Sequence, residues 1–105
     1  MNEKLLFHGV PATTEADITA GPATGKAWVI TALWIVNTAP TDKTLTLKHY
    51  IDASNTRTLI PGTQFLAQQT EIIGPLVLEA GHKLRASQGT ADAIELIAYG
   101  LEGTA

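Results

Sequence analysis

Turn-forming residues interrupt the apolar segments of this chain at short intervals, and this spacing limits the folds that it can adopt. Gly, Pro, Asn and Asp separate segments rich in Val, Ile, Leu and Thr, and no long segment keeps an apolar stripe of helical period. The pattern predicts strands over 4–10, 16–19, 26–37, 44–51, 63–73, 76–78, 83–87 and 93–101, and segment 58–60 leads to a break at Pro61 and Gly62. Segment 63–73 also fits a short helix, and we favour a strand. The expected fold is all-β, a two-sheet antiparallel sandwich or jelly roll of seven or eight short strands.

Length and composition narrow the class of protein further. The 105 residues have the size of one domain, expected over 1–105, and the absence of cysteine excludes a disulfide framework, a thiolate zinc site and a cysteine nucleophile. The formal charge is -3 and the seven basic residues are scattered, which argues against nucleic acid as a partner. The start of the chain lacks a signal-peptide pattern, and the longest apolar stretch is too short to span a bilayer. We therefore expect no membrane partner and synthesis in the cytoplasm.

The segment 26–37 is apolar on both sides of the expected strand. Strict alternation directs Trp28, Ile30, Ala32, Trp34 and Val36 to one side, expected to be the core, and Val29, Leu33 and Ile35 to the other. The last strand repeats the pattern, with Ile97, Tyr99 and Leu101 opposite its core side. A sandwich buries only one face of each sheet, so a second apolar face needs a cover. The candidate interface is therefore Val29, Leu33, Ile35, Ile97, Tyr99 and Leu101.

Two covers are compatible with the sequence. The N-terminal strand or the loop 21–25 folds over the second apolar face within one chain, or another subunit covers it. Large exposed apolar patches mark interaction sites, and the low charge content of 16% favours a homo-oligomer or a larger assembly.

Motifs that would support chemistry are missing from the sequence. His8, His49 and His82 have no spacing typical of metal ligands, so we interpret them as structural, with His49 inward beside a hydrogen-bond partner and His82 at a turn. Ser54 and Ser87 lie in turn-like contexts without an obvious base. We expect no enzyme activity, no catalytic residues, no metal site and no cofactor.

A sugar-binding surface is the remaining site to consider. Trp28, Trp34, Tyr50 and Tyr99 supply the aromatic rings that stack on sugars. Trp28 and Trp34 share the expected core side of their strand with Ile30, so we interpret both as core residues.

Two stretches of the chain resemble small virion proteins of tailed bacteriophages. The first is Trp28 to Asn37, followed by a turn and an alternating strand. The second is the run from Gly74 to Ala86, Gly-Pro-Leu-Val-Leu-Glu-Ala-Gly-His-Lys-Leu-Arg-Ala, together with Tyr99 to Glu102 at the end of the last strand. The likeness is one of strands and turns and transfers no functional residue.

The resemblance implies a non-enzymatic structural role in the virion. The first expectation is a capsid decoration, or cement, protein that forms a homo-oligomer, with a trimer favoured, and binds the major capsid protein. The alternatives are an accessory subunit of the neck, tail or baseplate that binds tail proteins, and a carbohydrate-binding sandwich at a receptor-binding tip.

Overall fold

The computed structural model describes residues 3–104 and confirms the all-β prediction: this part of the chain forms nine strands and no helix. Residues 1, 2 and 105 of the expected domain lie outside the described residues. The strands are β1 (Lys4–Gly9), β2 (Ala16–Thr19), β3 (Lys26–Asn37), β4 (Lys43–Asp52), β5 (Asn55–Phe65), β6 (Thr70–Ile73), β7 (Leu76–Glu79), β8 (Lys83–Gln88) and β9 (Ile94–Thr104).

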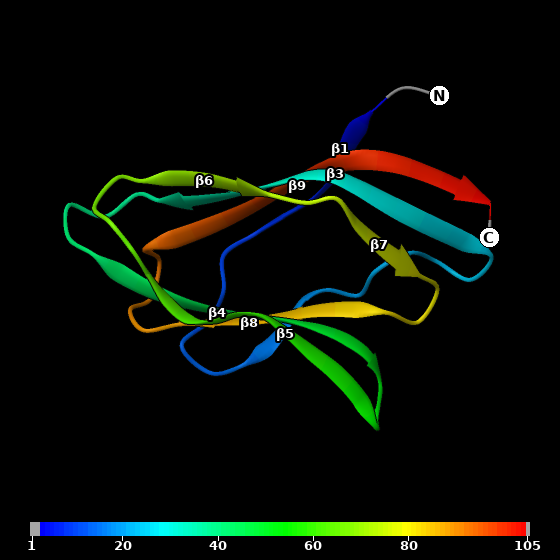
Figure 1. Cartoon of the computed structure of the whole chain (residues 1–105), viewed down its shortest axis with the longest axis horizontal. Helices are drawn as coiled ribbons and strands as arrows, with labels where there is room; N and C mark the ends of the chain where they lie inside the picture. The colour runs from blue at the N-terminus through cyan, green and yellow to red at the C-terminus, as the bar shows by residue number, and fades with distance from the viewer. Residues whose placement is uncertain (1–2, 105) are drawn as a thin grey trace.

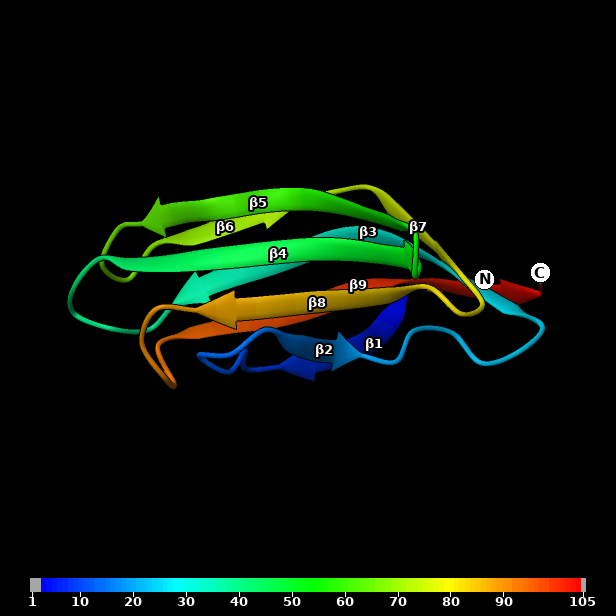
Figure 2. The same cartoon turned by 90° about the horizontal axis from the view of Figure 1, so that it is seen from below.

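The strands form two antiparallel sheets that pack face to face (Figure 1). Sheet A has the order β1-β9-β3-β6, with β7 following β6 along the same edge of β3, and sheet B has the order β2-β8-β4-β5. Figure 2 shows the four strands of sheet B side by side. If β6 and β7 are counted as one interrupted strand, these orders are those of an eight-stranded jelly roll.

The segment 63–73 is two strands rather than the single strand that the sequence predicted. Strand β5 ends at Phe65, and β6 begins at Thr70 on the other sheet. Between them the Gln69 side chain accepts a hydrogen bond from the Leu66 amide at 2.7 Å, which closes a tight loop. Pro61 does not end β5, because β5 lies at the edge of sheet B, where a strand tolerates proline.

The core lies between the inner faces of the two sheets. Its buried apolar side chains come from both sheets, so each sheet buries its inner face against the other. They are Trp28, Ile30, Leu33, Ile35, Leu45, Leu47, Ile60, Phe65, Leu78, Leu84, Ala86, Ala93, Ile94, Leu96 and Ala98.

A β-bulge in β3 corrects the predicted orientation of its side chains. Ile30 lies opposite Gly100 and Ala32 opposite Tyr99, so Thr31 is an extra residue without a partner on β9. Even-numbered side chains therefore point to the core before Thr31, and odd-numbered side chains point to it after Thr31. The core side is Trp28 and Ile30 before the bulge but Leu33 and Ile35 after it.

Five of the sequence-based assignments on β3 are consequently wrong, because Ala32 and Val36, which were expected in the core, also lie on the outer face after the bulge. Leu33 and Ile35 were expected on the outer face, and both are fully buried in the core. Trp34 was expected in the core, and its side chain points outward with 38% of its surface exposed. Trp28 is buried as expected, and its indole Nε1 donates to Glu102 Oε2 at 2.9 Å.

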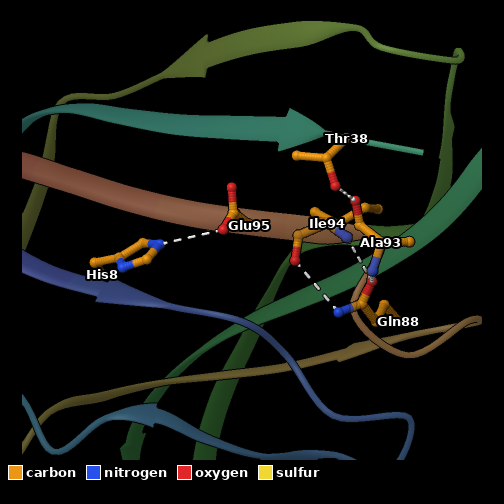
Figure 3. A network of polar contacts seen from close by, with 6 residues as sticks. All are labelled: His8, Thr38, Gln88, Ala93, Ile94 and Glu95. Carbon is orange, nitrogen blue, oxygen red and sulfur yellow. Dashed lines mark hydrogen bonds and ion pairs between the residues drawn. The ribbon is translucent and has the colours of Figure 1, made fainter. Parts of the chain in front are cut away.

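Two buried amide side chains hold the loops at one end of the sandwich. Asn37 Nδ2 donates to the carbonyl oxygens of Thr41, Phe65 and Leu66 at 3.0–3.1 Å. On β8, Gln88 bonds the backbone of the loop that leads into β9, as Figure 3 shows. Residues 3–104 contain no buried side-chain nitrogen or oxygen without a hydrogen-bond partner.

Candidate functional site

The outer face of sheet A collects most of the exposed apolar side chains in the described chain. Eight large apolar side chains are exposed between residues 3 and 104, and six of them lie on this face, each with 38–56% of its surface accessible. We define the apolar face as these six together with their outward neighbours Ile97 and Leu101. Its residues are Leu5, Val29, Trp34, Ile72, Val77, Ile97, Tyr99 and Leu101.

The pairing of the strands arranges these side chains in rows across the sheet. Directly opposed residues of antiparallel strands point to the same face and touch one another. One row crosses β7, β3 and β9 as Val77, Val29 and Leu101. A second row runs from β3 to β1 as Ala32, Tyr99 and Leu5.

A third row completes the face and ends on a polar residue. It runs Ile72, Trp34, Ile97 and then His8 on β1. His8 Nε2 lies 3.6 Å from Glu95 Oε1, and Figure 3 shows this contact beside β9. The rows are thus apolar across three strands, and the His8–Glu95 contact lies at the margin of the face.

A hollow of about 560 Å³ opens on the apolar face. Trp34, Ile97 and Tyr99 line it together with Ala32, and Glu3 supplies a carboxylate. Ala32 carries only a methyl group, so it leaves space between the larger side chains in the rows beside it. The hollow could receive a flat or projecting group from a partner.

The outer face of sheet B has the opposite character. None of the eight exposed large apolar side chains lies on β2, β4, β5 or β8. Ion pairs cross this face instead: Lys48 Nζ lies 2.7 Å from Glu15, and Arg85 Nε lies 2.8 Å from Asp17. The Arg85 guanidinium also lies 4.0 Å from the centre of the Tyr50 ring. Such a charged face is ordinarily stable in water.

The Asp17 carboxyl titrates as expected for a group within this charged network. Its hydrogen bond with Arg85 lowers the pKa of Asp17, and the charges of Lys83 and Arg85 lower it further against the opposing effect of burial. Asp17 therefore stays ionised beside Arg85 at neutral pH, and the polar face of sheet B needs no apolar partner.

Four of the six residues predicted for the interface lie on the apolar face: Val29, Ile97, Tyr99 and Leu101. Leu33 and Ile35 belong to the core, as described above. The sequence analysis missed Leu5, Trp34, Ile72 and Val77. The one sequence signal of the bulge was Thr31, a polar residue within an otherwise apolar strand. This bulge turns the Trp34 side chain to the outer face.

Neither of the intrachain covers considered from the sequence lies over the apolar face. Strand β1 pairs with the edge of β9 and adds Leu5 to the face instead of covering it. The loop 21–25 passes the β7–β8 turn, since a Cβ at Gly21 would lie 2.0 Å from the carbonyl oxygen of His82. The face stays exposed within residues 3–104.

The residues considered for other chemistry are dispersed, apart from one pair. His49 Nε2 and His82 Nδ1 lie 3.1 Å apart, so the hydrogen-bond partner expected for the inward His49 is the other histidine. Ser87 lies on β8 opposite Thr46, and the Ser54 amide donates to Asp52. The described residues contain no group of three or more His, Asp or Glu side chains placed to hold a metal ion.

The four aromatic residues considered for a sugar site lie in three places. Trp28 is in the core and Tyr50 is on the outer face of sheet B, whereas Trp34 and Tyr99 meet at the hollow.

No helix in residues 3–104 has the length and apolar character of a membrane span.

Comparison with known proteins finds no family model, no curated protein and no solved structure that matches this chain.

Proposed function

We propose that this protein is a non-enzymatic structural subunit that docks onto other protein subunits through the apolar face of sheet A. The observation that carries the proposal is the difference between the two faces, because exposed apolar residues gather on sheet A while paired charges cover sheet B. Burial of apolar surface drives association at roughly 25 cal/mol for each Å² removed from water. A partner with an apolar surface would bind this face and leave sheet B in solvent.

The composition of the face suits a protein partner. The centres of protein interfaces are rich in aromatic residues and poor in charged ones, and Trp and Tyr are frequent among the residues that dominate binding energy. Trp34 and Tyr99 flank the hollow in the middle of the face, and both are partly exposed. The rigid sheet presents them with little conformational entropy to lose on binding.

The place that we propose for this subunit is the virion of a tailed phage. The segments 28–37 and 74–86 resemble small virion proteins, and jelly rolls occur in viral capsid and lectin domains, although a fold alone does not define a function. In this proposal the protein is a capsid decoration protein, a homo-oligomer with a trimer favoured, and it binds the major capsid protein. The alternative is an accessory subunit of the neck, tail or baseplate.

A matched pair of variants tests the docking face. Ile72 and Thr58 are both exposed and lie on β6 and β5, so each accepts a glutamate without entering the core. A carboxylate buried without a partner is strongly unfavourable, so we expect Ile72→Glu to weaken self-association by at least about tenfold. Light scattering against concentration measures the effect, and Thr58→Glu should behave as the unmodified protein does. Equal association of the two variants would contradict the proposal.

Sedimentation separates the head and tail placements. The protein is mixed with expanded empty capsids or with purified tails, and the pellet is analysed for it. A decoration protein pellets with capsids, and Ile72→Glu pellets less. Retention on tails alone would replace the decoration role with the accessory role.

Carbohydrate binding is the second candidate, because the bulge places Trp34 and Tyr99 together on an exposed surface. Sugar rings stack on aromatic faces, and the Glu3 carboxylate could accept hydrogen bonds from sugar hydroxyls. Binding on a glycan array that is lost in Trp34→Ala would favour this candidate. An array without signal, together with pelleting on capsids, would eliminate it.

A further inference from the structure

The histidine pair lies where the chain crosses from one sheet to the other. His49 is on β4, opposite Leu84 of β8, and points toward the interior. His82 is in the turn between β7 of sheet A and β8 of sheet B, and only 16% of its side chain is exposed. The 3.1 Å contact between His49 Nε2 and His82 Nδ1 therefore joins this crossover turn to sheet B.

The environment of the pair indicates which nitrogen donates. Glu79 Oε2 lies 3.8 Å from His82 Nε2, so the neutral form of His82 that suits this carboxylate carries its proton on Nε2. His82 Nδ1 is then the acceptor, and His49 Nε2 is the donor. The predicted arrangement runs from the N–H of His49 to His82, and from the N–H of His82 toward Glu79.

The pair can take up one proton and keep its hydrogen bond. If His82 is protonated, its Nδ1–H donates to His49 Nε2, and His49 moves its own proton to Nδ1. A second proton leaves an N–H on both facing nitrogens and no acceptor between them. Two cations would then lie 3.1 Å apart, and the contact would become repulsive.

We propose that His49 and His82 form a pH-sensitive latch, which holds the β7–β8 turn against β4 while the pair carries at most one proton and releases the turn when the pair takes up a second. The latch goes beyond the proposed function and does not depend on it. Strand β7 is a four-residue edge strand that pairs only with β3, and the turn after it leads into β8, where Lys83 pairs with Tyr50 of β4.

The charged groups around the pair set the pH at which the latch opens. Burial, and then the charges of His82 and of Arg57 on β5, lower the pKa of His49 below its usual value of 6.5. Glu79 on β7 and Asp52 at the end of β4 are the carboxylates that face His82. The cations around His49 disfavour its protonation, so His49 takes up the second proton, and the latch opens below the usual pKa of histidine.

The lowered pKa fixes the sign of the pH dependence. The unfolded chain takes up the His49 proton near pH 6.5, whereas the folded chain takes it up only at lower pH. As the pH falls through this window the unfolded state binds more protons, and the folded state loses stability. For one proton the unfolding equilibrium constant rises by up to about tenfold for each pH unit.

Variants with amide side chains test the latch, because an amide can occupy the position of the imidazole nitrogen without taking up a proton. His49→Gln places its amide near the position of Nε2, and His82→Asn places its amide near that of Nδ1. Unfolding in urea is followed from pH 7.5 to 5. We expect the unmodified protein and His8→Gln to lose stability below pH 6.5, whereas His49→Gln loses much less. If His49→Gln does not fold, His82→Asn gives the same comparison.

Hydrogen exchange distinguishes opening of the latch from general acid destabilisation. The amides of residues 79–83 should lose protection between pH 7 and pH 5, after correction for the intrinsic exchange rate, while the amides of β9 keep theirs. The same loss of stability in His49→Gln as in the unmodified protein would overturn the proposal. Uniform loss of protection over the turn and β9 would overturn it as well.

Discussion

At the scale of single residues, Gln88 shows how this small domain fixes its loops without disulfides. The Gln88 side chain is almost completely buried, and it bonds four backbone groups. Its Nε2 donates to the carbonyl oxygen of Pro11. Figure 3 shows the other bonds, in which Nε2 donates to the carbonyl oxygen of Ile94 and Oε1 accepts from the amides of Ala93 and Ile94. One amide thereby joins the β1–β2 connection to the start of β9.

Removal of this amide should be costly. Gln88→Ala would leave buried backbone donors and acceptors without partners, and each such group costs about 1–3 kcal/mol. We expect the free energy of unfolding, measured in urea, to fall by at least about 2 kcal/mol. Gln64 is the control, because its side chain is exposed and bonds only Asp42. A loss in Gln64→Ala as large as that in Gln88→Ala would contradict the role assigned to Gln88.

At the scale of strands, the bulge at Thr31 determines which residues of β3 form the core and which form the apolar face. The Thr31 hydroxyl donates to the Tyr99 carbonyl at 3.2 Å, which ties the extra residue to β9. Gly100 lies directly beside the bulge, and a Cβ there would lie 2.0 Å from the Val29 carbonyl oxygen. The close approach of β9 to β3 at this point therefore requires glycine.

Two adjacent alanine substitutions test the change of phase. Leu33 is fully buried, so Leu33→Ala should lower the free energy of unfolding by about 2–5 kcal/mol, the usual cost of a cavity in a core. Trp34 is partly exposed on the other face, so Trp34→Ala should cost clearly less although it removes a larger side chain. Urea unfolding of both variants gives the comparison. The reverse order would return Trp34 to the core and Leu33 to the surface.

The sequence was sufficient to locate the strands, but it did not reveal the bulge in β3. Alternation and turn residues located almost every strand, because turn chemistry and side-chain period are local properties. A single extra residue moves every later side chain of the strand to the opposite face of the sheet. The position of this residue depends on the pairing with β9, which lies far along the chain. For the same reason the meeting of His49 with His82 required the pairing of the sheets to be known.

At the scale of the whole molecule, the charged outer face of sheet B favours solubility, and the apolar outer face of sheet A favours association. Lys48, Arg85 and their carboxylate partners cover sheet B with paired charges, whereas sheet A presents rows of apolar side chains. A sandwich needs only its inner faces to be apolar. The apolar outer face therefore adds nothing to the core, and association is the benefit that would offset its exposure.

The two faces also predict opposite responses of association to salt. Raising sodium chloride from about 0.1 M to about 1 M shortens the screening length from about 10 Å to about 3 Å, which weakens contacts between charged surfaces. Apolar association does not weaken, and sulfate strengthens it because the salt is excluded from the protein surface. Since apolar side chains form the rows of this face, we expect self-association to persist in 1 M salt and to increase in sulfate. Light scattering at fixed protein concentration measures both. A tenfold or greater weakening in sodium chloride would mean that the charged face of sheet B makes the contact, and the apolar face would lose its assigned role.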